Sequence, residues 1–154
     1  EDLKEYIVVH QNDFYLPEAV SNARVENQNL HALKDINYLL ITSNEFVEQA
    51  QRIANYHIEN SGLTAKVVIL DEIYNEFSSG AADLVAIRDF MRMFYNRATN
   101  PADLPKYLLL FGDGSYDNKG SGESNTNFIP TYQSLNSISL IRSYVSDDFF
   151  GFLD

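Results

Sequence analysis

The stretch Tyr107-Leu-Leu-Leu-Phe-Gly-Asp-Gly114 decides the fold that this sequence predicts. Its first five residues, Tyr107 to Phe111, are large and apolar without alternation, which is typical of a strand buried on both faces of a parallel sheet. The strand should stop at Gly112, and Asp113 follows it directly. Because binding sites in open α/β sheets form at the ends of such strands, Asp113 is the first candidate functional residue.

Two further apolar runs precede this strand, at residues 38–41 and 65–70, and we expect both to be strands. Apolar residues recur at three-and-four spacing in residues 46–58 and again in residues 84–95, which predicts a helix in each interval. The order strand, helix, strand, helix, strand favours right-handed crossovers. The predicted fold class is therefore α/β, with a mainly parallel sheet flanked by helices in three layers.

The first helix carries recognisable end signals. Thr42 and Glu45 fit a capping box, with Ser43 or Asn44 as alternative caps, and Gly62 provides the stop. Residues 71–79 resemble a polar connection with at most one short helical turn. The buried stripe of the second helix should consist of Leu84, Val85, Ile87, Phe90, Met91, Phe94 and Tyr95.

Residues 1–36 are the least regular part of the chain, and we interpret them as an extension or linker before an α/β subdomain at residues 37–154. A short strand is expected at Tyr6–Val9 and a helical turn near residues 30–33. His10 and His31 have no partner at metal-ligand spacing and should be ordinary surface or capping residues. His57 falls on the apolar stripe of the first helix, where a half-buried imidazole bonded to a carbonyl is expected.

The composition of the chain excludes some kinds of partner and of catalytic residue. The 22 acidic and 11 basic residues give a formal net charge of −11, and no Lys/Arg run occurs, so nucleic acid is not an expected partner. No uninterrupted apolar run of about 18 residues is present, so we expect no membrane-spanning segment. The chain has no cysteine, which excludes a cysteine nucleophile within these residues. Since it begins at Glu1 rather than Met, we expect it to be a piece of a longer polypeptide.

The acidic turn after the last strand has two interpretations. Asp113, Ser115 and Asp117 occupy positions one, three and five of a calcium loop, but Asn118 stands at position six and Ser124 at position twelve, so it is not an EF-hand. A dinucleotide fingerprint fails too, because Asp117 replaces its third glycine. A looser calcium site of carboxylate and carbonyl oxygens is one interpretation; aspartates that only bond turn amides are the other.

The rest of the chain is less regular. Residues 119–127 should form a mobile surface loop, and residues 128–132 should return to the core. The tail at residues 142–154 alternates enough to be strand-like. On a strand, Asp147 and Asp148 would point to opposite faces and could not act as a general acid/base pair.

Three segments in order, residues 109–113 (Leu-Leu-Phe-Gly-Asp), 128–134 (Phe-Ile-Pro-Thr-Tyr-Gln-Ser) and 143–151 (Ser-Tyr-Val-Ser-Asp-Asp-Phe-Phe-Gly), resemble the gingipain-type cysteine peptidases. The resemblance covers about residues 37–154 and is strongest to the branch that serves as sortase of the type IX secretion system of Bacteroidetes. It implies a caspase-like catalytic domain of two α/β subdomains side by side, of which this chain would be the first. The catalytic histidine and cysteine would lie beyond Asp154.

The resemblance also implies partners and site residues. By this resemblance, Asp113 falls where that branch binds calcium. Asp154, in a segment similar to another part of the same site, and Asp117, which has no clear counterpart, are weaker candidate ligands; none of the three histidines matches the catalytic motif. The chain would be a non-catalytic subdomain that contacts the downstream catalytic subdomain and, through it, protein substrates. The parent enzyme would cut C-terminal signals from secreted cargo and join the new terminus to an amine-bearing lipopolysaccharide at the cell surface, outside the cytoplasm.

Other classes of function stay open at this point. A flavodoxin-like or receiver-like binding module would share the α/β pattern, yet Thr42-Ser-Asn-Glu45 supplies hydroxyls without glycines and only one acid after the first strand. A purely structural or partner-binding domain is the third possibility, and it overlaps with the first if the parent enzyme is inactive.

Overall fold

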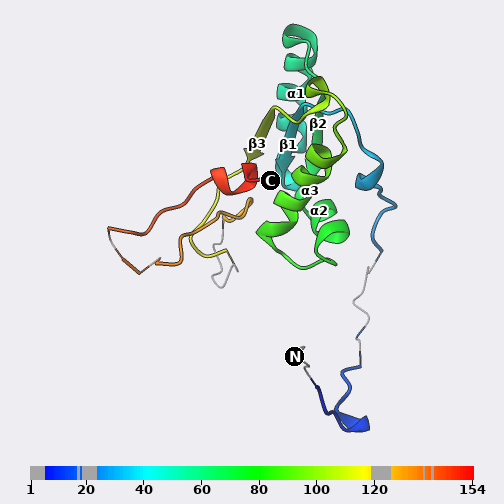
Figure 1. Cartoon of the computed structure of the whole chain (residues 1–154), viewed down its shortest axis with the longest axis vertical. Helices are drawn as coiled ribbons and strands as arrows, with labels where there is room; N and C mark the ends of the chain where they lie inside the picture. The colour runs from blue at the N-terminus through cyan, green and yellow to red at the C-terminus, as the bar shows by residue number, and fades with distance from the viewer. Residues whose placement is uncertain (1–5, 17, 19–23, 119–125, 137, 140) are drawn as a thin grey trace.

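A computed structural model describes residues 6–16, 18, 24–118, 126–136, 138–139 and 141–154. The helices and strands form an α/β body, and an N-terminal segment and a long arm extend away from it in different directions (Figure 1). The chain ends beside the last strand of the body (Figure 1).

The sheet is parallel and has three strands, β1 (Tyr38–Thr42), β2 (Ala65–Ile69) and β3 (Tyr107–Phe111), in the order β2-β1-β3. Thr42, the last residue of β1, is paired with Ile69 on one side and with Phe111 on the other. The carboxyl ends of all strands are therefore level, and Asp113 lies at the same end as the other strand termini.

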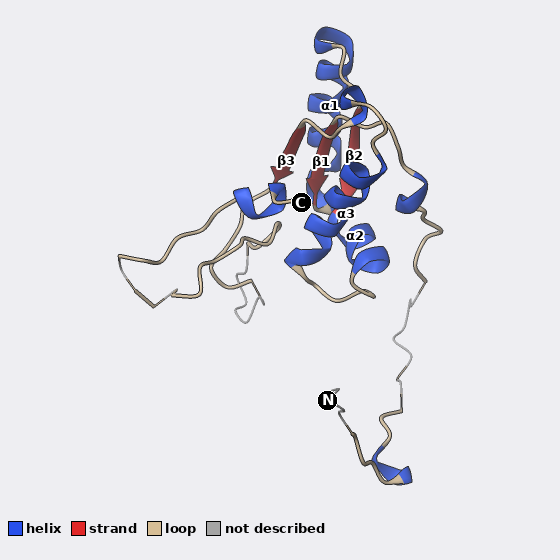
Figure 2. Cartoon of the chain, in the orientation of Figure 1, coloured by secondary structure: helices blue, strands red, loops and turns tan. Residues whose placement is uncertain are grey.

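Helices cover both faces of the sheet (Figure 2). Alternate residues of β1 point to opposite faces. Leu40 packs in a cluster with Ala54 of α1 (Val47–Ser61). Leu39 and Ile41 belong to the larger core with α2 (Leu70–Phe77) and α3 (Leu84–Arg97). The predicted three-layer α/β class with a parallel sheet is confirmed.

The connection between β2 and α3 differs from the prediction of a polar link. Helix α2 begins at Leu70, directly after Ile69, and its apolar side chains Leu70, Ile73, Tyr74 and Phe77 follow helical spacing. Asp71 in its first turn is favoured by the positive end of the helix dipole. Because the segment begins with acidic residues, its sequence suggested a loop, although it forms a short amphipathic helix.

The capping box expected before α1 does not form. Ser43 precedes a 3₁₀ turn, Asn44–Phe46, without a side-chain cap, and α1 begins only at Val47. Thr42 instead donates its hydroxyl hydrogen bond to the Phe111 carbonyl oxygen, at 2.8 Å, and so ties β1 to β3. Gly62 ends the helix with φ 63°, as predicted.

Two predictions for helix side chains were wrong: the burial of Tyr95 and the hydrogen-bond partner of His57. Tyr95 of α3 is 41% exposed, and the buried stripe includes Ala86 and Met93 in its place. His57 is half-buried as expected, but its Nδ1 lies 3.1 Å from the Ser61 hydroxyl rather than on a carbonyl.

The N-terminal segment forms no strand within its described residues. Tyr6 to Val9 are exposed, so this part of the prediction was wrong. The helical turn expected near residues 30–33 is present as Leu30–Ala32. We call residues 28–33 the strap, because they cross α2 and carry Leu30 into the core.

The C-terminal tail is not a regular strand either. Within the described residues, a single antiparallel bridge joins Gln133 to Val145, and the Ser134 amide donates to the Tyr144 carbonyl oxygen at 3.0 Å. We call residues 131–147 the arm. A 3₁₀ helix, Asp148–Gly151, follows and buries Phe150 against α3. Most of the loop predicted at residues 119–127 lies outside the described residues.

Candidate functional site at the carboxyl end of the sheet

The turn after β3 is held by the returning segment at residues 128–131. The Asp113 carbonyl oxygen accepts hydrogen bonds from the amides of Phe128, at 2.9 Å, and Ile129, at 3.1 Å. A Cβ atom on Gly114 would overlap the Thr131 methyl group and lie 3.1 Å from the Ile129 carbonyl oxygen. A glycine is therefore required at position 114 by the close approach of residues 129–131.

Amide side chains close the same turn. Asn118 donates from Nδ2 to the Thr131 carbonyl oxygen, at 2.9 Å, and its Oδ1 accepts from the Thr131 amide, at 3.1 Å. Asn127 Oδ1 accepts from the Ser115 amide at 2.8 Å. Asn118 and Asn127, which lie before and after residues 119–125 in the sequence, therefore both help to hold this turn in place.

The acidic residues predicted to bind calcium are not gathered by the described structure. The side chains of Asp113 and Asp154 are exposed, and Asp117 is half-buried with its amide bonded to Ser115 Oγ at 3.2 Å. No group of three or more His, Cys, Asp or Glu side chains suited to a metal ion occurs among the described residues. Calcium requires six to eight oxygen ligands, so binding at Asp113 would need further ligands, and it stays a prediction.

A cleft of about 410 Å³ opens at this end of the sheet, between the starts of α2 and α3 and the residues that flank the turn. Asp71, Tyr74 and Asp83 line it, with apolar walls from Leu70 and Phe128. Burial, and then the carboxylates of Asp71 and Asp83, raise the pKa of Tyr74 to about 12. Sequence reasoning missed this group, although Asp71 directly follows a predicted strand.

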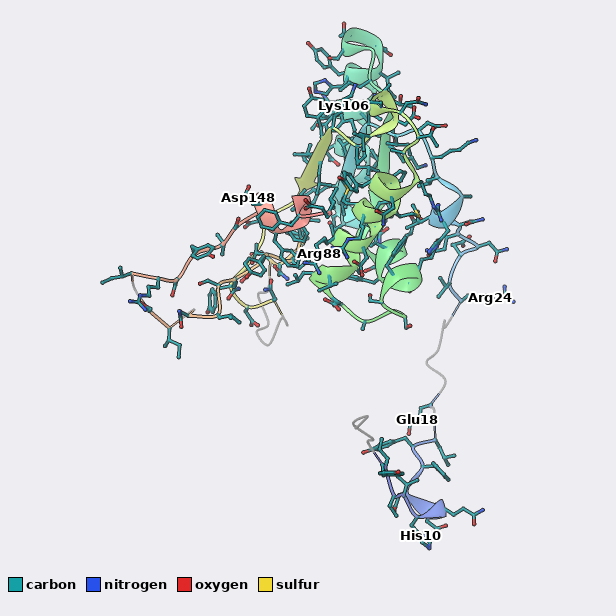
Figure 3. All side chains as sticks on the ribbon, viewed as in Figure 1. His10, Glu18, Arg24, Arg88, Lys106 and Asp148 are labelled. Carbon is teal, nitrogen blue, oxygen red and sulfur yellow. The ribbon has the colours of Figure 1, made fainter. Side chains whose placement is uncertain are left out.

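The base of the arm is fixed by a stack of rings. Phe149 lies parallel to Tyr132 with 4.6 Å between ring centroids, and the Arg88 guanidinium lies 4.5 Å from the Phe149 ring centroid. Figure 3 shows Arg88 far from Lys106, which precedes β3 at the amino end of the sheet. Asp147 and Asp148 are exposed at this base and start a 3₁₀ turn, so the opposite-face geometry expected of a strand does not apply.

The histidines lie apart from this site. His10 is exposed and accepts the Asn12 amide at Nδ1, while His57 is on α1. His31 belongs to the strap, where its Nδ1 lies 2.6 Å from Glu76 Oε2 and its ring stacks on Phe77. These contacts are structural, as the sequence predicted for His10 and His31.

The free edge of β3 is the second notable surface. Tyr107 is 55% exposed, and the rest of β3 is half-buried rather than fully buried as predicted, because β3 lies at the edge of the sheet. Clefts of about 590 Å³ and 420 Å³ flank it, and both are lined by Tyr107, Leu108 and Leu109. A cleft therefore lies beside β3 on each face of the sheet.

These features define an α/β fold with an open sheet edge, and comparison with known proteins places the chain in a family. Residues 31–154 match the model of peptidase family C25, and the chain belongs to that family. Among solved structures, it is similar to dimeric latent PorU from Porphyromonas gingivalis, with 38% sequence identity and a TM-score of 0.73. The match covers 84% of this chain and 13% of that chain. No curated protein matches significantly.

The resemblance to gingipain-type peptidases, and to PorU among them, is therefore confirmed at the level of family and fold. The family assignment favours the peptidase hypothesis over a flavodoxin-like or receiver-like module. Within the part of the chain that the structure describes, no helix is long and apolar enough to cross a membrane.

Proposed function

We propose that this chain is the non-catalytic first subdomain of a C25 cysteine peptidase, and that its β3 edge receives the first strand of the catalytic subdomain. The open edge of β3 carries this proposal. An edge strand presents unpaired backbone N–H and C=O groups, and proteins usually protect such an edge with charged residues. Strand β2, at the other edge, contains Lys66, whereas β3 contains only apolar and aromatic residues.

The clefts beside β3 support the same assignment. A strand added to this edge would cover Tyr107, and elements connected to that strand would fill the clefts on both faces. The apolar lining from Leu108 and Leu109 gains from burial at about 25 cal/mol per Å². The β3 edge is therefore apolar like the interior of a protein, although it is partly exposed, as expected of a surface that another strand covers.

The chemistry of the family requires residues that this chain does not contain. A cysteine peptidase needs a thiolate nucleophile activated by a base, and the chain has no cysteine. The turn at residues 112–118 would form one wall of the cleft, while the nucleophile and its histidine would come from the neighbouring subdomain. The parent enzyme would act on C-terminal signals of secreted proteins as a sortase outside the cytoplasm, which is what the sequence resemblance to the sortase branch of the family implies.

Two measurements test this proposal. The chain alone should hydrolyse no peptide, with or without calcium and reducing agent, and hydrolysis that survives removal of contaminating proteases would contradict it. Hydrogen exchange of the β3 amides should slow when the chain is joined to the following subdomain. Unchanged exchange at Tyr107–Phe111 in the longer protein would show that the edge is not the junction.

Calcium binding is a separate part of the proposal, with Asp113 as the first ligand and Asp117 and Asp154 as weaker candidates. The variant Asp113→Asn keeps the backbone bonds to Phe128 and Ile129 but removes the charge. Calorimetric titration with calcium should show weaker binding for this variant in the longer protein. Equal binding by the variant and the wild type would remove Asp113 from the ligand set.

A further inference from the structure

The N-terminal segment contains two apolar runs, residues 6–9 and 14–16, that no described part of the chain covers. The exposed fraction of their side chains ranges from 51% for Val9 to 100% for Tyr15. Soluble proteins rarely leave a contiguous apolar surface exposed unless it contacts another molecule or domain. The segment is therefore a candidate contact surface.

A defined turn joins the two runs. His10 Nδ1 accepts the Asn12 amide at 3.2 Å, and the His10 amide donates to Asp13 Oδ2 at 3.0 Å, so that both side chains cap the 3₁₀ turn Gln11–Asp13. His10 and Phe14, on either side of the turn, have extended backbone. The runs are rich in Val, Ile, Tyr and Phe, the residue types that favour strands. The segment thus has the form of two strands joined by a turn, but neither run is paired with any described strand.

The α/β body is a poor partner for these runs. The strap holds the chain to α2, where the Glu76 carboxylate accepts the Leu30 amide, and Figure 1 shows the strap on the side of the body away from β3. The other edge strand, β2, contains Lys66, a residue type that protects an edge from pairing. The family match starts only at residue 31, and the chain covers 13% of the similar PorU chain. A partner in another domain of a long polypeptide is therefore favoured.

Charge and spacing select the kind of partner. Residues 1–18 contain one lysine, Lys4, and these acidic residues: Glu1, Asp2, Glu5, Asp13 and Glu18. An anionic lipid surface would repel this composition, and the apolar residues lack the three-and-four spacing of an amphipathic helix. Unpaired strands are satisfied by the edge of a sheet, as in β-strand addition. We propose that residues 6–16 add two strands to the edge of a β-sheet in another domain of the parent polypeptide and so fasten the α/β body to that domain.

The proposal rests on the proposed function only in that the chain belongs to a longer polypeptide. Hydrogen exchange followed by mass spectrometry compares the chain with that parent polypeptide. In the chain alone, the amides of residues 6–9 and 14–16 should exchange at the rates of an unfolded peptide. In the parent, strand pairing should slow them at least about tenfold. Equal rates in the two proteins would overturn the proposal, and so would protection in the chain alone that grows with its concentration, because a second copy would then be the partner.

Two matched variants of the parent separate strand pairing from general charge effects. Val8→Asp places a charge in a strand that pairing would bury and should restore fast exchange at residues 6–16, while the β1 amides stay protected. Val25→Asp makes the same change at a position that is 64% exposed and lies outside the two runs, and should leave residues 6–16 protected. An equal loss of protection in both variants would contradict the proposal.

The same experiment distinguishes this proposal from the role of β3, because residues 6–9 and Tyr107–Phe111 give separate peptides. Slower exchange in β3 without slower exchange in residues 6–9 would overturn the strand addition and leave the proposed function standing. Slower exchange in residues 6–9 alone would support the strand addition and remove only the role of the β3 edge.

Discussion

At the scale of single residues, Gly114 determines how closely the two backbones at the carboxyl end of the sheet approach. We predict that Gly114→Ala destabilises the protein by about 1–3 kcal/mol, because its methyl group must displace Thr131 and the Ile129 carbonyl. Urea denaturation measures the change. Gly151→Ala is the matched control, since no atom lies within 4 Å of a Cβ built there. A similar loss in both variants would argue against the packing explanation.

Asp113 shows what sequence can and cannot locate at this scale. The apolar run before it and the glycines beside it placed the residue correctly at the carboxyl end of a parallel sheet. The sequence could not reveal that the backbone carbonyl of Asp113 makes the structural contacts while its carboxylate is exposed, because those contacts come from Phe128 and Ile129, far along the chain. Tyr74 was missed for the same reason, since its cleft is formed by three separate segments.

At the scale of elements, Glu76 fastens the strap to α2. Its carboxylate accepts the Leu30 amide at 2.6 Å, Gln28 Nε2 at 2.9 Å and the His31 amide at 3.2 Å. Burial opposes ionisation of this carboxyl group, but the hydrogen bonds outweigh it and lower the pKa of Glu76 from 4.5 to about 2. The native state therefore binds fewer protons than the unfolded state in this range.

The expected result is a stabilisation that is complete above about pH 4.5 and is lost as the pH falls toward 2. Glu76→Gln should lower the free energy of unfolding at pH 7 by about 1.5–3 kcal/mol and flatten this part of the pH profile. Denaturation at several pH values checks both effects. If Glu59→Gln flattened the profile equally, the strap contacts would not be the cause.

The sheet should not be uniformly stable. All five residues of β1 are buried and paired on both sides, whereas β3 has one free edge. We predict that β1 amides exchange with solvent only through global unfolding, with a free energy of about 5–15 kcal/mol, and that edge-facing β3 amides exchange faster. Hydrogen exchange followed by NMR gives both values. Faster exchange in β1 than in β3 would contradict the strand order.

The elements also show why patterns succeed or fail. The long helices and the parallel strands were predictable because each has an apolar repeat several turns or residues long. Helix α2 was missed because it has only eight residues and carries Asp71 and Glu72 in its first turn, where these acidic residues also suit a polar loop. The strand expected at Tyr6–Val9 failed because an apolar run forms a strand only when another strand pairs with it, and none of the described residues does so.

At the scale of the whole molecule, the net negative charge opposes self-association, whereas the open edge of β3 favours it. The net charge of −11 keeps copies apart at neutral pH, and this repulsion disappears near the isoelectric point of about 4.5. We predict that the chain self-associates as the pH approaches that value and that Tyr107→Lys reduces the association, because a charged residue protects the edge. Sedimentation velocity provides the measurement.

Tyr56→Lys is a close control for this variant, because Tyr56 of α1 is 61% exposed, compared with 55% for Tyr107, and the charge change is identical. An equal effect of the two substitutions would assign the association to overall charge rather than to β3.

The stack of Tyr132 on Phe149 has an optical consequence. The chain contains no tryptophan, so Tyr132→Trp would introduce a single indole chromophore at the place where the arm meets the body. Its emission should be shifted to the blue while the ring is covered by Phe149 and should move to the red if the arm swings free. The wavelength of one fluorophore would then report, in real time, whether the arm is seated.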